Sequence, residues 1–235
     1  MPGAHAPLDG ATLTFELPGL PATVIVTTAK AGDLRPGAEG AAGRQAAVCP
    51  GPWSVTRQVR GGAVARAGDE LKEADALVGR PSDRVAMFAA DCCLLGLVSP
   101  EGHVAAVHAG WQGLRAGVVE AAAAALRAEG AGEILAVLGA SIRPECYEFG
   151  GEDLETVTAV YGEAVAARTA AGSLALDLPA GVKIACERAG IEVLHEVEEC
   201  TACARAPDGS YRYFSHRARA ETERHALVVT PNDGR

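Results

Sequence analysis

The sequence predicts an α/β fold, with mixed strands and helices in a single domain. Apolar runs of strand length recur along the chain, with alanine-rich segments of helical spacing between several of them. Neither an internal repeat nor a polar linker divides the 235 residues. We therefore predict one domain over residues 11–230, with a flexible tail at residues 1–10 and another at residues 231–235.

The strands are predicted from alternating or β-branched apolar residues that lie between turn formers. They fall at residues 13–17, 23–28, 53–59, 63–67, 84–90, 94–98, 103–108, 134–138, 191–197, 211–215 and 226–230. Apolar spacing predicts helices at residues 114–129, 153–167 and 179–189, where Pro179 suits a first helical turn. Residues 31–44, rich in Gly, Ala and Arg, predict a mobile surface loop, and residues 69–78 a short helical or irregular segment.

Composition narrows the class of protein. The net charge of -9 and the absence of a basic run argue against nucleic acid as a partner. No apolar run reaches membrane-spanning length, and the first ten residues lack the features of a signal peptide. Seven cysteines with no sign of secretion predict reduced thiols. We expect a cytoplasmic protein that binds neither nucleic acid nor a membrane.

The most informative stretch is residues 89–117. Asp91 and Cys92 lie at the end of one predicted strand, and His108 lies at the end of the next, with the turn formers of residues 99–102 between them. Adjacent strands joined by a tight turn bring these side chains to one rim, where a thiolate and an imidazole can bind metal or act in catalysis. Gly110 and Gly113 open the following helix and predict a tight turn whose backbone N–H groups attract anions. Burial in the core is the alternative for a cysteine and a histidine in apolar strands.

Cys200 and Cys203 form a C-x-x-C pair. A structural zinc site needs a second pair of ligands, and no such pair follows at a suitable spacing. The sequence therefore favours ordinary neighbouring thiols in a loop.

A set of short motifs carries a resemblance to a known family. In chain order they are Ala74-Asp75-Ala76-Leu77-Val78, Ala90-Asp91-Cys92, His108-Ala109-Gly110-Trp111-Gln112-Gly113, Cys146-Tyr147-Glu148, Cys200-Thr201-Ala202-Cys203, Phe214-Ser215-His216-Arg217 and Thr222-Glu223-Arg224. Together they resemble the YfiH-like laccase-domain family, also called multicopper polyphenol oxidoreductase-like proteins. The resemblance covers roughly residues 53–224.

The resemblance implies a mixed α/β sandwich in one domain, with a metal, usually zinc, held by one cysteine and two histidines. The implied activity is phosphate-dependent cleavage of purine nucleosides, as by a purine nucleoside phosphorylase, with adenosine deamination in some members. Copper-dependent oxidation of polyphenols and a role in editing peptidoglycan precursors are also attributed to the family. The implied small-molecule partners are a purine nucleoside and phosphate, and the implied cofactors are zinc or copper.

By motif, the resemblance places the metal ligands at Cys92 and His108. The third should lie in a Gln-Val-His-Gly motif, which here carries Arg60 in place of the histidine. Arginine stays protonated and offers no lone pair, so it cannot be a ligand. Two ligands are fewer than the three protein ligands of a catalytic zinc, so we expect zinc to be weakly bound or absent.

Other donors in this stretch are poorly placed to complete the site. His103 should point to the opposite face of its strand from His108, ~16 Å away. Cys93 should face away from Cys92 for the same reason. Cys146 is then the one plausible replacement thiol.

Two classes of function stay open. In the first, the protein is an enzyme of the family in which Cys92, His108 and Asp91 are catalytic. The phosphate-binding residues would then be Arg60, Gly110, Gly113 and Arg217. In the second, it is a non-catalytic paralogue that binds a nucleoside or another small ligand.

Overall fold

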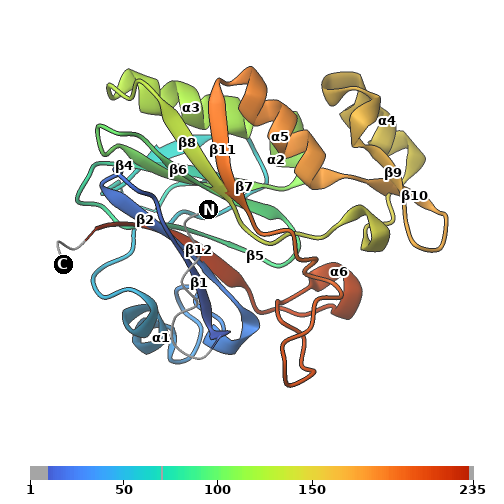
Figure 1. Ribbon diagram of the computed structural model, residues 1–235, viewed down its shortest axis with the longest axis horizontal. Helices are drawn as coiled ribbons and strands as arrows, with labels where there is room; N and C mark the ends of the chain where they lie inside the picture. The colour runs from blue at the N-terminus through green and yellow to red at the C-terminus, as the bar shows by residue number, and fades with distance from the viewer. Residues whose placement is uncertain (1–9, 70, 233–235) are drawn as a thin grey trace.

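The computed structural model describes residues 10–69 and 71–232, and two stacked sheets with a layer of helices make up the chain (Figure 1). The predicted tails fall largely outside these residues. The first sheet is antiparallel, in the order β1-β2-β12-β5. Its strands are β1 (Thr12–Glu16), β2 (Ala22–Thr27), β12 (His225–Pro231) and β5 (Val85–Ala89).

The second sheet is mixed and has the order β11-β8-β6-β7-β4-β3. Its strands are β11 (Ile191–Glu196), β8 (Ile134–Leu138), β6 (Cys93–Val98), β7 (Val104–Ala109), β4 (Ala76–Gly79) and β3 (Val64–Arg66). The predicted turn at residues 99–102 does join β6 to β7, which pair antiparallel. The prediction of a mixed α/β sandwich is confirmed.

Helices cover the outer face of the second sheet in Figure 1. They are α2 (Trp111–Arg115), α3 (Val118–Ala128), α4 (Gly151–Tyr161) and α5 (Leu178–Arg188). Two further helices, α1 (Ala41–Val48) and α6 (His216–Arg219), lie apart from this layer. A small hairpin of β9 (Ala166–Arg168) and β10 (Leu174–Leu176) lies beside α4. No helix in the described part of the chain is long and apolar enough to cross a membrane.

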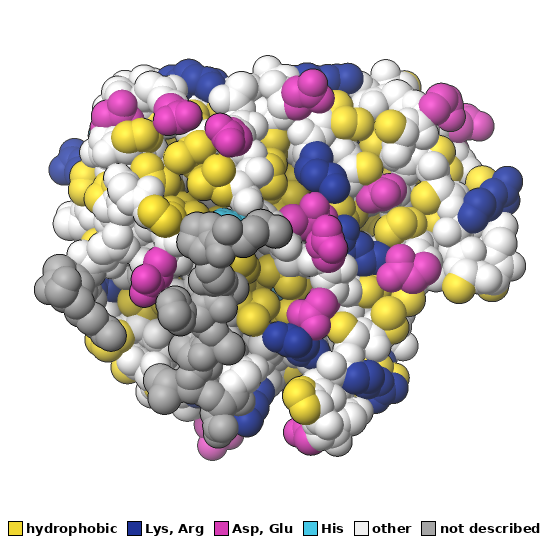
Figure 2. Space-filling view, viewed as in Figure 1, with side chains coloured by type: hydrophobic (Ala, Val, Ile, Leu, Met, Phe, Trp, Pro, Cys, Tyr) yellow, Lys and Arg dark blue, Asp and Glu magenta, His cyan; other side chains and the backbone are white. Residues whose placement is uncertain are grey.

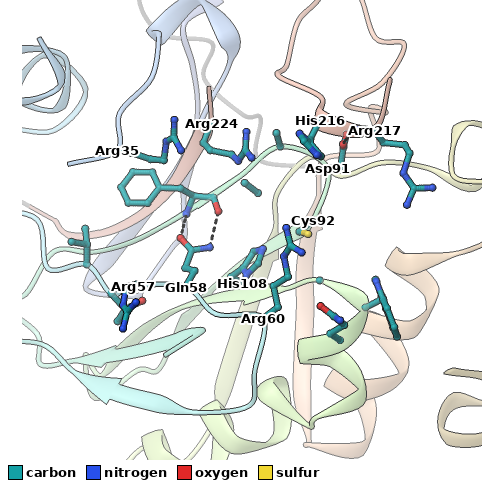
Figure 3. Close-up of a pocket in the computed structure, with 18 of the residues that line it drawn as sticks. Arg35, Arg57, Gln58, Arg60, Asp91, Cys92, His108, His216, Arg217 and Arg224 are labelled. Carbon is teal, nitrogen blue, oxygen red and sulfur yellow. Dashed lines mark hydrogen bonds between the residues drawn. The ribbon is translucent and has the colours of Figure 1, made fainter. Parts of the chain in front are cut away.

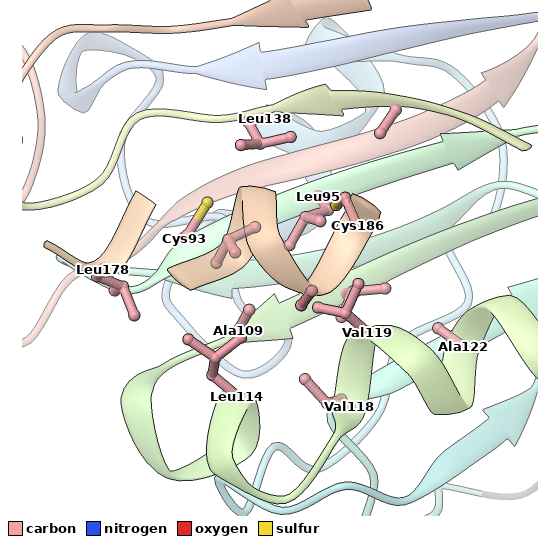
Figure 4. Packing of buried hydrophobic residues seen from close by; sticks show 14 of the residues in the cluster. Cys93, Leu95, Ala109, Leu114, Val118, Val119, Ala122, Leu138, Leu178 and Cys186 are labelled. Atoms are coloured by element: carbon pink, nitrogen blue, oxygen red, sulfur yellow. The ribbon is translucent and has the colours of Figure 1, made fainter. Parts of the chain in front are cut away.

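The period-2 pattern of β6 and β7 divides the core into two layers. Cys93, Leu95 and Leu97 pack with the helices, and in Figure 4 Cys93 and Leu95 lie beneath α5 among side chains of α3 and α5. The alternate residues Leu94 and Val98 pack between the two sheets. The strand position therefore decides which layer each side chain enters.

Gly96 lies on the face of β6 that packs against the first sheet. A Cβ at this position would lie 2.8 Å from Val24 Cγ1, so any side chain must push the sheets apart. We expect Gly96→Ala to lower the free energy of unfolding by about 1–3 kcal/mol, measured by urea denaturation. As a control, Gly43→Ala in α1 meets no atom within 4 Å and should stabilise by up to ~1 kcal/mol. A neutral Gly96→Ala would contradict this account of the interface.

Several predicted elements were wrong. Residues 53–59 and 211–215 form only isolated bridges instead of strands, and residues 31–44 contain the start of α1. The segment at residues 69–78 holds β4 rather than a helix, and the predicted helix at residues 153–167 stops at Tyr161. The predicted helix at residues 114–129 is broken at Gly117, whose φ is +74°, and begins earlier, at Trp111.

Candidate functional site

A cavity of about 740 Å³ opens at the end of the two sheets where β5 and β7 finish. Its lining residues come from segments far apart in sequence, namely residues 35–36, 55–58, 60, 71, 88–92, 108, 110–112, 147, 216–217 and 224. The volume suits a small-molecule ligand. Figure 3 shows its polar side chains converging from these segments.

Cys92 and His108 both line this cavity, as the sequence predicts. His108 pairs with Leu94 across β6 and β7, so its ring points to the inter-sheet side. Cys93 faces the helices instead. A Cβ at Gly110 would lie 2.9 Å from Cys92 Sγ and 3.9 Å from His108 Cε1, so only glycine lets the chain pass this close to both groups.

Asp75, fully buried, holds the floor of the site together. Its Oδ1 lies 2.8 Å from His108 Nδ1. Its Oδ2 accepts hydrogen bonds from the N–H groups of Val59 (3.1 Å) and Gly61 (2.7 Å). One carboxylate therefore orients the imidazole and fixes the loop that carries Arg60.

The same contacts set the charge of His108. Burial alone would lower its pKa, but Cys92 and the hydrogen bond to Asp75 outweigh burial and raise the pKa to about 9. The Asp75 carboxyl is affected oppositely: burial would raise its pKa, yet hydrogen bonds from His108 and Gly61 hold it below the usual value. At neutral pH the pair is an imidazolium against a carboxylate.

Arg60 projects from a loop that is fastened on both sides. Gln58 exchanges two hydrogen bonds with the backbone of Phe88, at 2.8 Å and 3.0 Å. Arg60 has φ 63°, a left-handed conformation that non-glycine residues seldom adopt. In Figure 3 its side chain extends into the cavity on the side of Cys92.

Asp91 has φ 94° and is buried, and both of its carboxylate oxygens have partners. Oδ1 accepts from the Thr201 hydroxyl at 2.7 Å, and Oδ2 accepts from the Arg217 N–H at 2.7 Å. The side chain thus fastens two distant segments to the cavity wall.

Five arginines line the cavity, whereas Asp91 is the one carboxylate among the described lining residues. They are Arg35, Arg57, Arg60, Arg217 and Arg224. Elsewhere charges are mixed: on the face drawn in Figure 2, acidic and basic side chains are interspersed. In a chain of net charge -9, this concentration of cations singles out the cavity as a site for an anion.

Arg224 and Arg35 repel each other in this cluster. Burial and the charge of Arg35 lower the pKa of Arg224. Arg35 is held in place by a two-point contact with Asp33, with Arg35 Nη2 2.6 Å from Asp33 Oδ2. A bound anion between two such guanidinium groups would relieve their repulsion.

Two aromatic rings also line the cavity. Trp111 and Tyr147 line the cavity, and each packs edge-on against Phe149, with ring centroids 5.5 Å and 5.3 Å apart. The Arg217 guanidinium lies 4.8 Å from the Tyr147 ring centroid. These rings can stack with a planar base.

The donor set of the cavity does not fit a zinc with three protein ligands. Cys92 and His108 offer two donor atoms, and the guanidinium of Arg60 offers none. Within residues 10–69 and 71–232, only one group of three or more His, Cys, Asp or Glu side chains has its donor atoms within 4.8 Å of one another. It consists of Glu145, Cys146, Cys200 and Cys203, none of which lines the cavity. Cys146, the predicted replacement, belongs to this group.

The two predicted glycines have different surroundings. Gly110 lines the cavity, whereas Gly113 is buried and does not. A Cβ at Gly113 would lie 3.1 Å from the Gly61 carbonyl oxygen, so this glycine lets α2 approach the loop of Arg60. It positions the cavity rather than lining it.

His225 lies behind the site, fully buried beside the ring of Tyr213, with a centroid distance of 5.7 Å. Burial lowers its pKa to about 4, outweighing the nearby carboxylate of Asp91. Between pH 6.5 and 4, His225 is protonated in the unfolded chain but neutral in the folded protein. The free energy of unfolding therefore falls as the pH drops through this range. We expect a loss of about 2 kcal/mol between pH 7 and 5, and a smaller loss in His225→Phe. Urea denaturation at both pH values measures this, and equal losses in the two proteins would contradict it.

The comparisons identify the family. The model of the family described as multi-copper polyphenol oxidoreductase laccase matches residues 40–231. The chain belongs to this family. It is 37% identical over 148 residues to a purine nucleoside phosphorylase of Streptomyces coelicolor, and 35% identical over 161 residues to the purine nucleoside phosphorylase YfiH of Escherichia coli.

These matches cover 62% and 67% of this chain, and 58% and 64% of the respective relatives. A protein named adenosine deaminase RL5 is 32% identical over 142 residues, which are 57% of this chain and 54% of that protein. Among solved structures, YlmD of Geobacillus stearothermophilus has a TM-score of 0.81 at 22% identity and covers 99% of this chain and 100% of its own. A Neisseria meningitidis protein has the same score and identity, with coverages of 94% and 99%. These two structures support the fold.

Sequence reasoning missed several residues of the cavity. Asp75 was noted only within a motif, although a buried aspartate between apolar residues is itself a signal of a partnered charge. Arg35 lay in a segment predicted as a mobile loop, and Arg57 in a predicted strand. Arg224 is part of a motif that carries the resemblance, but the motif alone assigns it no role.

Proposed function

We propose that the cavity binds a purine nucleoside together with phosphate, and that the protein cleaves the glycosidic bond by phosphorolysis. The observation that carries the proposal is the set of five arginines around a cavity in an acidic chain. The names of the relatives supply the substrate class. Phosphate would bind the guanidinium groups, and the purine would pack against Trp111 and Tyr147.

The chemistry then needs a nucleophile, a leaving base and a proton. A phosphate oxygen attacks C1′ of the ribose while the C1′–N9 bond breaks and its electron pair passes to the purine. His108, held by Asp75, is placed to donate a proton to the leaving base. The phosphate proton restores His108, so the products are ribose 1-phosphate and the free purine.

In this proposal Arg60 supplies a fixed positive charge where the family pattern has a metal-binding histidine. The guanidinium stabilises the phosphate and the charge that develops on it. Cys92 and Asp91 then have supporting roles. Asp91 orients the Arg217 backbone, and Cys92 lies beside His108 and Gly110 in the cavity wall.

Deamination is not part of the proposal. Activation of water for deamination by a catalytic zinc would need three protein ligands, and Cys92 and His108 supply two. With adenosine as substrate, the proposal therefore expects adenine and ribose 1-phosphate, without ammonia.

Incubation of the chelator-treated protein with inosine or adenosine tests the proposal. We expect purine base and ribose 1-phosphate to appear in equal amounts, and only when phosphate is present. Arg60→Ala should lose most of the rate, whereas Arg80→Ala, which removes a charge outside the cavity, should not. Release of purine base at a rate that does not depend on phosphate, or release of ammonia, would refute the proposal.

The loss of the third donor at Arg60 also favours a second candidate, a paralogue that binds nucleoside and phosphate without turnover. Saturable binding of both ligands with no product would identify it.

A further inference from the structure

A second group of donor side chains lies outside the cavity, in the wall behind it. Cys146 ends the short 3-10 helix η3 (Pro144–Cys146), and Cys200 and Cys203 lie in the turn that follows β11. The three sulfurs and a Glu145 carboxylate oxygen all lie within 4.8 Å of one another. The cysteines form no disulfide.

These separations approach those of a metal centre. In a tetrahedral zinc site with Zn–S bonds of about 2.3 Å, neighbouring sulfurs are about 3.8 Å apart. The group therefore needs a contraction of about 1 Å or less to close around an ion. Three thiolates and one carboxylate make a soft, four-donor set suited to zinc.

The backbone holds Cys200 in a fixed position. The Arg143 N–H donates to Cys200 Sγ at 3.3 Å, a contact that can remain when the sulfur binds a metal. The Arg143 side chain anchors the same turn, with one nitrogen donating to the Val197 carbonyl oxygen at 2.9 Å and another 2.7 Å from Glu196. The donors are thus held on a fixed frame.

One hydrogen bond links the two segments that carry the donors: the Thr201 N–H donates to the Ser141 carbonyl oxygen at 3.1 Å. Within the first segment, the Cys146 N–H donates to the Arg143 carbonyl oxygen at 3.0 Å. Cys200 is buried, Cys146 half-buried, and Cys203 and Glu145 exposed. An ion can therefore reach the group from solvent while its inner side stays fixed.

We propose that Cys146, Cys200 and Cys203, with Glu145 or a water as the fourth ligand, bind one zinc ion in a structural site separate from the cavity. The C-x-x-C pair finds its further ligands upstream, from Glu145 and Cys146, rather than in a second pair downstream. This proposal does not depend on the proposed function.

A zinc ion at this site would also affect the cavity, because two neighbours of its ligands contact the cavity wall. Thr201, between two of the ligands, donates to Asp91, and Tyr147, next to Cys146, lines the cavity. Zinc would brace the wall that carries both contacts. Because the ion binds the folded chain, it should raise the melting temperature in a saturable manner.

Cobalt and zinc titrations of the full chain under reducing conditions test the proposal. We expect one cobalt ion per chain, with a tetrahedral spectrum and thiolate charge transfer, and displacement by zinc. Cys203→Ser removes an exposed ligand and should weaken binding at least tenfold and abolish the stabilisation by zinc. Cys146→Ser should do the same.

Cys92→Ser is the matched control, because it removes a thiol from the cavity and leaves the group intact. It should keep one equivalent of metal and the full stabilisation. Loss of binding in Cys92→Ser with retention in Cys203→Ser would overturn the proposal. So would a wild-type chain that binds no cobalt, or a disulfide among the three cysteines that persists under the reducing conditions of the titration.

Discussion

Replacement of Asp75 with alanine is expected to lower the free energy of unfolding by about 3–5 kcal/mol. The substitution leaves a buried imidazolium without its counter-charge and leaves the N–H groups of Val59 and Gly61 without their acceptor. The loop of Arg60 should loosen at the same time. Urea denaturation at neutral pH measures the loss.

The loss of stability in Asp75→Ala can be checked with a control substitution and by its dependence on pH. Asp69→Asn, in an exposed turn, should change stability by less than ~0.5 kcal/mol. Since the folded pKa of His108 is raised to about 9, its contribution is present below pH 6.5 and is lost as the pH rises toward 9. Wild type should therefore lose stability over this range, and Asp75→Ala should lose less. If Asp75→Ala were as stable as wild type, Asp75 would not be the residue that holds His108 and the loop of Arg60 in place.

Arg60→His is expected to add one zinc ion per chain to whatever the wild type binds. The change restores a third donor beside Cys92 and His108 and removes a cation that repels the ion. Histidine tolerates the left-handed backbone of this position better than most residues. Elemental analysis after equilibration with zinc and gel filtration gives the stoichiometry.

The added ion must be located by a second substitution. In an Arg60→His, Cys92→Ser double variant the gain should disappear, since only two imidazoles remain. A gain that survives the Cys92 change, or no gain in Arg60→His, would show that the cavity cannot form the three-ligand site.

Local pattern was enough to predict Cys92 and His108. Successive side chains of a strand point to opposite faces and a tight turn joins the two strands, so period and adjacency place both residues at one rim. Cys93 and His103 were excluded from the rim by the same periodicity, and the structure places Cys93 in the helix-side core.

Contacts between residues far apart in the chain could not be predicted from local sequence patterns. Arg35 reaches the cavity because Leu34, an isolated apolar residue in a Gly-rich segment, is fully buried in a small core against β5 and β12. A single apolar residue forms no periodic pattern, so the burial of Leu34 could not be inferred from the sequence. The grouping of Cys146 with Cys200 likewise depends on the bridge between Ser141 and Cys200, which spacing cannot reveal.

Calorimetric titration of the chelator-treated protein with inorganic phosphate tests the central claim most directly, namely that arginines rather than a metal make the cavity an anion site. We predict saturable binding to one site, weakened about 10- to 100-fold in Arg60→Ala and unchanged in Arg80→Ala. Phosphate binding that appears only after zinc is added, or that is unchanged in Arg60→Ala, would contradict the claim.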